Sequence, residues 1–321
     1  MSALHLPARD IPVPSSVSLE AQSFLSMGSL HDDLMMYPAI DDTEGWRTYV
    51  RNTEGIIGAD FIARADKVDV AVEQREIGGV TVNVATPAGL DQDDERVVLD
   101  IHGGGLILGG RSICTATTKL AAATTGLRTW GPDYRMAPDH PYPAALDDCL
   151  VVYRALLEER PPERVVVTGM SAGGNLSAAL VVRAQDEGVP PPAALVLQTP
   201  ELDLTESGDS FETNLGIDTV LGRLGPMNEL YANGHDLAHP YLSPLFADVT
   251  GFPPTMLTAG TRDLFLSNAV RMHRALRKAG VEAELHILEA APHGGFQGTA
   301  PEDADLALEA ARFICKHCPP S

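Results

Sequence analysis

Short apolar runs recur along the chain after residue 95, and a longer pattern typical of a helix follows most of them. The runs are RVVLDI (96–101), RTWGPDY (128–134), RVVVTGM (164–170), AALVLQTP (193–200), PTMLTAG (254–260) and AELHILE (283–289). Nearly continuous apolar runs are typical of strands covered on both faces, as in a mostly parallel sheet with flanking helices. Two earlier runs, VDVAVEQREI (68–77) and VTVNVATP (80–87), meet at a Gly-Gly pair that favours a hairpin. The sequence therefore predicts an α/β fold with an eight-stranded, mostly parallel sheet.

Two long segments interrupt this alternation. Residues 1–68 contain methionine-rich stretches typical of helices, and residues 201–247 form a long connection with many Gly, Pro, Asn and His residues. A connection longer than about 15 residues inside a compact domain usually has a function, such as that of a lid. We expect both segments to form one helical cap over the carboxyl edge of the sheet, where open α/β folds bind ligands. Residues 69–200 and 248–321 then form the two parts of the core.

The acidic composition restricts the expected partners. Against 44 Asp and Glu, the 321-residue chain has 23 Lys and Arg, which gives a formal net charge of −21. Such a surface repels nucleic-acid phosphates and anionic lipid head groups, so we expect neither nucleic acid nor a membrane as a partner. A small-molecule substrate is expected instead, and the sequence is compatible with a homodimer.

Targeting and cysteine patterns give a second set of expectations. The first 18 residues lack a continuous apolar stretch behind basic residues, and no later stretch reaches the ~18 apolar residues of a membrane span. We therefore expect a cytoplasmic protein. Four scattered cysteines do not form a disulfide framework. Cys315 and Cys318 lack a second pair of ligand residues at metal-binding spacing, so we expect no metal and no other cofactor.

The apolar run at 164–170 leads into GMSAGG (169–174) and then into a helical pattern. This matches G-x-S-x-G, in which a serine occupies a tight turn between a strand and a helix. Gly169 and Gly173 let neighbouring backbone approach closely enough for that turn. Ser171 is therefore the candidate nucleophile, and the Ala172 amide at the helix N-terminus would face a developing negative charge.

A serine hydroxyl needs a base, and a histidine base needs a carboxylate to hold its tautomer. The downstream histidines are His235, His239, His273, His286, His293 and His317. Only His293 lies on a glycine-bearing loop just after the last predicted strand, so it is the candidate base. Asp263, just after the preceding strand, is the candidate acid, although aspartate is also favoured as a helix N-cap at such a position. Asp203 and Glu289 are alternative acids.

The segment HGGG (102–105) follows another buried strand. Three consecutive glycines carry a conformational entropy penalty, and they are expected where bare backbone must approach a ligand closely. Backbone amides of such a loop can stabilise the oxyanion formed when a serine attacks an acyl carbonyl. A flexible turn is the alternative interpretation. His102 precedes the serine, and we expect it to orient this loop rather than to act as the base.

Five motifs, in this order, resemble those of the hormone-sensitive-lipase-like esterases, the bacterial family IV carboxylesterases. They are HGGG (102–105), DYRMAPDHPYPAALDD (133–148), GMSAGGNL (169–176), GTRDLFLSN (260–268) and PHGGF (292–296), within a likeness that spans about residues 70–315. The resemblance implies an α/β-hydrolase fold, the triad named above and oxyanion amides from Gly104, Gly105 and Ala172. It also implies a cap built from an N-terminal segment and an insert after the sixth strand.

Two departures from the family pattern concern the substrate and the pH optimum rather than the reacting groups. Met170 precedes the nucleophile where many relatives carry an acidic residue or threonine, and Leu264-Phe265 follow the acid where many relatives have Pro-Leu. The leading hypothesis is a serine carboxylester hydrolase. An amidase, lactonase or carbamate hydrolase with the same triad is an alternative, and a non-catalytic small-molecule receptor is a second one. Receptors that resemble this family lack the histidine, which is present here.

Apolar residues of the two cap segments are candidates for the lining of the substrate pocket. These residues are Leu30, Met35, Met36 and Tyr37 in the first segment and Leu215, Met227 and Tyr231 in the second. Apolar pockets favour added acyl methylenes by about 0.8 kcal/mol each until the space is filled. The sequence therefore predicts a preference for soluble esters of short to medium chain length.

Overall fold

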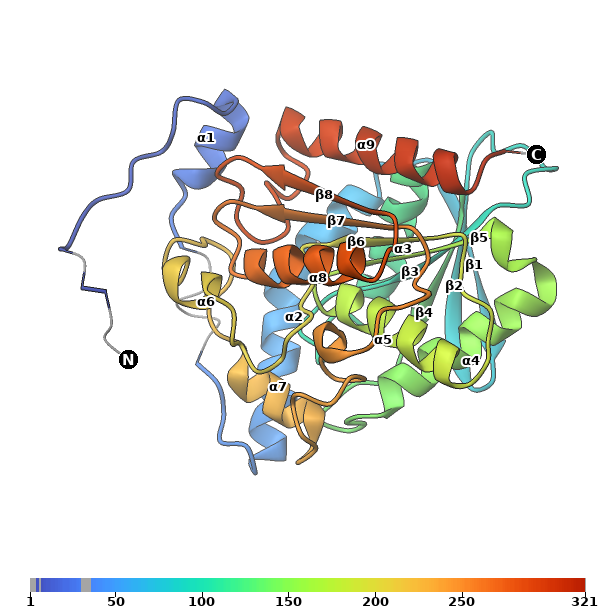
Figure 1. The fold of residues 1–321 in the computed structure, drawn as a ribbon, viewed down its shortest axis with the longest axis horizontal. Coiled ribbons are helices and arrows are strands. Elements are labelled where there is room, and N and C mark those ends of the chain that lie inside the picture. The colour runs from blue at the N-terminus through green and yellow to red at the C-terminus, as the bar shows by residue number, and fades with distance from the viewer. Residues whose placement is uncertain (1–3, 6, 30–35, 321) are drawn as a thin grey trace.

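The computed structural model describes residues 4–5, 7–29 and 36–320, and it has the predicted α/β architecture (Figure 1). One sheet has its eight strands in the order β1-β2-β4-β3-β5-β6-β7-β8. The strands are β1 (Val70–Ile77), β2 (Val80–Pro87), β3 (Val97–Ile101), β4 (Arg128–Asp133), β5 (Val165–Met170), β6 (Ala194–Gln198), β7 (Thr255–Gly260) and β8 (Ala283–Leu288). β2 pairs antiparallel with β1 and β4, and every other neighbouring pair is parallel. The predicted strands are confirmed, each within a few residues of its expected bounds.

Helices cover both faces of this sheet. α3 (Ser112–Thr125) and α9 (Pro301–His317) pack on one face, and α4 (Ala144–Glu159), α5 (Ala172–Asp186) and α8 (Leu266–Lys278) pack on the other. Short 3₁₀ turns occupy Pro162–Arg164 and Pro244–Phe246. Alternate residues of β5 face opposite layers: Val166 packs with Phe313 of α9, whereas Val167 belongs to the cluster formed with α4 and α5. Because both faces are buried, the strands read as nearly continuous apolar runs.

The segments outside the sheet supply the remaining helices. α1 (Leu19–Leu25) and α2 (Thr43–Ala65) lie within residues 1–68, and α6 (Ser210–Thr213) and α7 (Gly225–Ala232) lie within residues 201–247. In Figure 1 they lie at the left and lower left, on the side toward which the arrowheads of β7 and β8 point. Trp46 of α2 is fully buried in one apolar cluster with Phe211 and Met227 of the second segment and with Leu108. The two segments therefore pack together next to the loop that follows β3.

α1 contacts a different part of the core. Phe24 of α1 meets Phe296 edge-on, with ring centroids 6.1 Å apart. Ser18, the N-cap of α1, donates its hydroxyl to the Glu302 carboxylate over 2.8 Å. The N-terminal segment is thereby anchored against the loop that connects β8 to α9.

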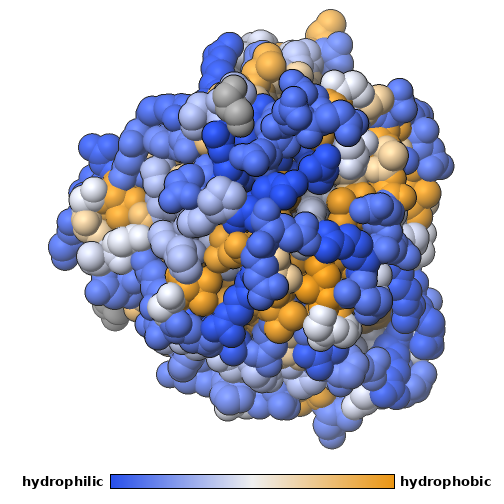
Figure 2. Space-filling view, turned by 90° about the vertical axis from the view of Figure 1, so that its right-hand side faces the viewer, coloured by the Kyte–Doolittle hydropathy of each residue, from blue (hydrophilic) through white to orange (hydrophobic). Residues whose placement is uncertain are grey.

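No helix in the described ranges is both long and apolar enough to cross a membrane. Figure 2 shows the end of the molecule that lies at the right of Figure 1, away from the cap helices. Polar residues dominate this face, and apolar residues occur on it as separate patches among them. This distribution agrees with the strongly acidic composition of the chain.

The close approach of α5 to β3 can be tested by adding a single methyl group. A Cβ at Gly173 would overlap the carbonyl oxygen of Ile101, which is backbone and cannot move aside. Gly173→Ala should therefore lower the free energy of unfolding by about 1–3 kcal/mol in urea titrations. Gly55→Ala is the matched control, because a Cβ at this site within α2 would meet nothing within 4 Å. The control should be neutral or stabilising by up to about 1 kcal/mol, and equal losses would refute the close approach.

Candidate active site

Ser171 occupies a strained turn between β5 and α5. Its φ of 58° and ψ of −121° lie in a region that residues with a side chain rarely adopt. A Cβ at Gly169 would overlap the carbonyl of Gly173, and a Cβ at Gly173 would overlap that of Ile101. The glycines of G-x-S-x-G are thus required by close backbone contacts, as the sequence predicts.

Backbone hydrogen bonds hold this turn in place. The Ser171 amide donates to the Gln198 carbonyl at the end of β6 over 2.9 Å. The Ser171 carbonyl accepts from the amides of Asn175, at 3.1 Å, and Glu201, at 3.2 Å. The serine is itself largely buried, with 6% of its surface exposed. Strands β5 and β6 and helix α5 therefore fix the candidate nucleophile together.

His293 and Asp263 form a buried pair on the neighbouring loops. Nδ1 of His293 lies 3.2 Å from Oδ1 of Asp263, and both side chains are buried. The same Asp263 oxygen accepts from the amide of Phe265, the residue before α8, over 2.8 Å, so this aspartate is held by the backbone as well as by the histidine. The Phe265 ring meets the imidazole edge-on, with centroids 4.8 Å apart.

The alternative acids occupy other surroundings. Asp203 is fully buried, and it accepts hydrogen bonds from Thr205 and Ser207 and pairs with Arg271 over 2.7 Å. Glu289 follows β8 directly and is exposed. It is Asp263 that accepts from His293, which supports the preferred assignment.

Asp218 is a residue that the sequence analysis did not identify. It lies in the second cap segment, is fully buried, and accepts from the His293 amide with both oxygens at 3.3 Å. It also accepts from the Leu264 amide at 2.8 Å, and from the amides of Val220 at 2.9 Å and Leu221 at 3.1 Å. Asp218 therefore connects residues 201–247 to the two loops that carry Asp263 and His293. No pattern in the sequence separates it from other aspartates in an irregular connection.

The electrostatics around His293 favour its protonated form. Burial lowers the pKa of the imidazole, but the carboxyl groups of Asp263 and Asp218 more than offset this, so the pKa lies above its usual value; Glu201 adds a smaller contribution, and only in its ionised form. Burial and the nearby Asp263 carboxylate raise the pKa of Asp218. A histidine in these surroundings is a stronger base than an isolated imidazole.

The HGGG segment turns back tightly against the nucleophile. Gly104 has a φ of 126° and Gly105 a φ of 57°, and the Gly104 carbonyl accepts from the amides of Ile107, at 3.2 Å, and Leu108, at 2.9 Å. A Cβ at Gly104 would overlap the Leu108 carbonyl. A Cβ at Gly103 would lie only 3.3 Å from that of Ser171. Glycines are therefore needed here both for the turn and for the approach to the serine.

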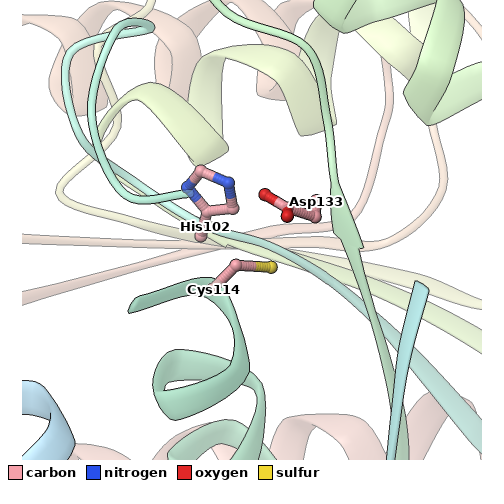
Figure 3. Close-up of side chains that lie close together, drawn as sticks. All are labelled: His102, Cys114 and Asp133. Carbon is pink, nitrogen blue, oxygen red and sulfur yellow. The ribbon is translucent and has the colours of Figure 1, made fainter. Parts of the chain in front are cut away.

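His102 packs against this loop, next to Cys114 and Asp133 (Figure 3). Its Nδ1 donates to the Gly103 carbonyl over 2.8 Å, and its ring stacks on Tyr134 with centroids 4.1 Å apart. The expected orienting role of His102 agrees with these contacts. Burial lowers the pKa of His102 and raises the pKa of the Cys114 thiol.

The ligand-type atoms of His102, Cys114 and Asp133 lie within 4.8 Å of one another, which raises the question of a metal ion. A metal would need Cys114 as a thiolate. The raised pKa of this thiol disfavours the thiolate, and one Asp133 oxygen already accepts from the Arg111 amide at 2.9 Å. The three residues fit a packed support of the loop better than a metal centre.

The candidate lining residues are spread over several environments. Met227 approaches the HGGG loop, with its sulfur 3.5 Å from the position of a Cβ at Gly105, and Tyr37 packs in the same apolar cluster. Met36 and Leu215 are exposed. Tyr231 is fully buried in the main core, where it meets Tyr142 edge-on, and it lies outside the cluster that holds Met227. Leu30 and Met35 are outside the described residues.

A cavity of about 270 Å³ adjoins the site. Its walls include Met170, Gly103 and Gly294, which are the chain neighbours of Ser171, Gly104 and His293 respectively. Met170, the departure from the family pattern, lines one end of this cavity. Much of the remaining wall comes from α3 and α9, and Ser171 and His293 do not line it, so the cavity is next to the site rather than the substrate pocket itself.

Known proteins are similar to this chain in sequence. A family model described as the α/β hydrolase fold matches residues 98–297. An acetyl-hydrolase of Streptomyces hygroscopicus is 34% identical, covering 64% of this chain and 68% of its own length. The carboxylesterase NlhH of Mycobacterium tuberculosis is 31% identical, covering 70% of this chain and 76% of its own.

Solved structures agree with these relatives. Esterase E25 matches with a TM-score of 0.92 and 34% identity over 98% of this chain and 99% of its own. EstE7, a homologue of hormone-sensitive lipase from a metagenome library, matches with a TM-score of 0.77 and 30% identity over 93% and 98%. The chain belongs to the hormone-sensitive-lipase-like family of carboxylesterases with the α/β-hydrolase fold.

Proposed function

We propose that this chain hydrolyses carboxylic esters with short to medium acyl chains through an acyl-enzyme on Ser171. The observation that carries the proposal is the buried His293–Asp263 pair, on loops at the same edge of the sheet as the strained serine turn. A non-catalytic receptor has no need for a histidine whose tautomer is held by a carboxylate. The paired histidine therefore favours catalysis over binding alone.

The proposed reaction has two steps. His293 takes the hydroxyl proton of Ser171 as its oxygen attacks the acyl carbonyl, and it then gives that proton to the departing alcohol. The acyl group remains as an ester on Ser171. Water, deprotonated by His293, attacks this ester and releases the carboxylic acid, and the proton returns to the serine. Asp263 accepts from Nδ1 throughout and stabilises the imidazolium of each step.

The amides of Gly104, Gly105 and Ala172 are the proposed donors to the tetrahedral oxyanion. Two observations support them: the HGGG turn lies against Ser171, and Ala172 is the first residue of α5. Each fixed donor of this kind is worth about 3 kcal/mol in the transition state. Glycines at 104 and 105 keep side chains away from the carbonyl oxygen.

The proposed substrate class rests on the apolar side chains beside the HGGG loop. Met227 and Tyr37 belong to one apolar cluster there. Such surroundings favour acyl chains of about two to eight carbons, because each added methylene gains binding energy only until the space is filled. Amides, lactones and carbamates are alternative substrates of the same triad, and they are outcomes of the test below.

Loss of any triad member should abolish most ester turnover. We expect Ser171→Ala and His293→Ala to lower kcat for 4-nitrophenyl esters by several orders of magnitude, with the double variant scarcely worse than either. Asp263→Asn should fold and yet lose about 10⁴-fold, because the wrong histidine tautomer is favoured. Asp203→Asn is the control, and it should lower Tm while retaining most turnover. A Ser171→Ala variant with more than about a tenth of wild-type turnover would contradict the assignment.

The pH dependence of turnover should show the effect of Asp218 on the pKa of His293. Turnover requires neutral His293, so activity should rise with pH through a value above the usual imidazole pKa. Asp218→Asn removes one of the charges that raise this pKa, and the acidic limb of kcat/KM should move to lower pH. Asp203→Asn should leave the limb in place, since Asp203 is not among these charges. An unmoved limb in Asp218→Asn would refute the coupling.

A series of acyl chain lengths tests the substrate class. We expect kcat/KM for 4-nitrophenyl esters to rise by up to about fourfold per methylene from the acetate, and then to fall before long chains are reached. The series should be run beside matched amides and lactones. Long-chain triglyceride emulsions as the best substrates would contradict the proposed class, and so would clear selectivity for amides.

A further inference from the structure

The backbone of Glu201 forms two hydrogen bonds with the residues around Ser171, although Glu201 has no role in the proposed reaction. It follows β6 in the sequence TPELD, and its amide donates to the Ser171 carbonyl over 3.2 Å. Its own carbonyl accepts from Nδ2 of Asn175, in the first turn of α5, over 2.8 Å. The backbone of Glu201 is therefore fixed relative to the serine.

The Glu201 side chain reaches helix α7. It is fully buried, and Oε1 accepts from Nδ2 of Asn228 on α7 over 2.9 Å. Oε2 is buried as well and has no hydrogen-bond partner among the described residues. Met227, the residue before Asn228, lies against Gly105 of the oxyanion loop. One helix thus contacts both the loop that carries the proposed oxyanion donors and the carboxyl group fixed to Ser171.

The surroundings favour an uncharged Glu201. Burial raises its pKa to about 8, and the hydrogen bond from Asn228 offsets only part of that effect. Glu206 and Asp203 on the same connection raise the pKa further, whereas His293 lowers it. Tyr37, from the first cap segment, is the other titratable neighbour, and its own pKa is raised mainly by burial and in part by Glu201. At neutral pH these surroundings therefore favour the protonated carboxyl group.

We propose that Glu201 is a positioning residue of this esterase, whose carboxyl group connects the nucleophile turn to helix α7 by its hydrogen bond to Asn228. Through this tie the oxyanion loop, which Met227 contacts, keeps its place relative to Ser171. The inference rests on the proposed role of Ser171 as nucleophile. It assigns to the cap a part in catalysis in addition to covering the substrate.

A protonated carboxyl group at this position has a consequence at alkaline pH. When Glu201 loses its proton, an unpaired negative charge forms in a buried site beside Ser171. The tetrahedral intermediate is itself negative, so a nearby buried carboxylate destabilises it. Wild-type kcat should therefore fall as the pH rises past about 8.

Two substitutions at position 201 separate positioning from ionisation. Glu201→Gln keeps the shape and an oxygen acceptor for Asn228 but cannot ionise, so it should retain kcat within about threefold at pH 7 and show no alkaline fall. Glu201→Met removes the acceptor and leaves the Asn228 amide unpaired, which should lower kcat at least about tenfold with little change in KM.

Glu206→Gln is the matched control. Glu206 also holds the start of α7, by accepting from the Leu224 amide over 2.6 Å, yet Ser171 does not accept from it.

The experiment measures kcat and KM for 4-nitrophenyl butyrate from pH 6 to 10, with active sites titrated by a phosphonate that labels the serine and with Tm recorded for each variant. The proposal is overturned if Glu201→Met keeps wild-type kcat, or if Glu201→Gln keeps the wild-type alkaline fall. It is also overturned if Glu206→Gln loses kcat as Glu201→Met does. Should Glu201→Met fail to fold, the profile of Glu201→Gln decides alone. Ser171→Ala in the same assay separates the two proposals, because residual turnover there would refute the nucleophile rather than the role of Glu201.

Discussion

The contact between the first turn of α5 and the end of β3 is the constraint on which the rest of the site depends. Gly173 lies so close to the Ile101 carbonyl that no side chain fits between them. This approach holds Ser171 at a φ of 58°, a conformation that the chain adopts only because its surroundings enforce it. β3 continues directly into His102 and the HGGG turn. The same contact therefore brings the oxyanion loop beside the serine.

The proposed cap, residues 1–68 and 201–247, contacts the serine turn and the HGGG loop through buried polar groups as well as apolar packing. Trp46 and Met227 belong to one cluster, which holds the two cap segments together beside the HGGG loop. Asp218 accepts from backbone amides on either side of the acid–base pair, and Glu201 connects the serine turn to α7. Displacement of the cap would leave these buried acceptors unpaired, which is energetically expensive. The cap and the catalytic loops are thus expected to move as one unit.

Much of the fold was predictable because a strand that is buried on both faces is a nearly continuous apolar run in the sequence. Eight apolar runs gave the eight strands, and glycine spacing around Ser171 gave the turn that the structure contains. The sequence favours Asp263 as the acid because it lies one α/β unit, 30 residues, before His293, and its pairing with His293 agrees with that prediction. These features depend on residues close together in the sequence.

Asp218 and Glu201 could not be found in this way. Each lies in an irregular connection without periodicity, and each matters because of partners more than 20 residues away, His293 and Asn228. Tyr231 illustrates the same limit. α7 is buried on two sides, with Met227 beside the HGGG loop and Tyr231 in the main core, and an eight-residue helix gives too little pattern to separate the two sides.

Three buried carboxyl groups, those of Asp263, Asp218 and Glu201, lie around the imidazole of His293. Their charge states follow from the donors that each group receives. Asp218 accepts from four backbone amides and Asp263 from an amide and the imidazole, whereas Glu201 receives one side-chain amide. Adjacent carboxylates cannot all ionise cheaply in a buried site, so the group with the fewest donors keeps its proton. The pKa of His293 is then raised in part by Asp218, a residue of the proposed cap, so we expect changes in residues 201–247 to alter the pH dependence of the site as well as its shape.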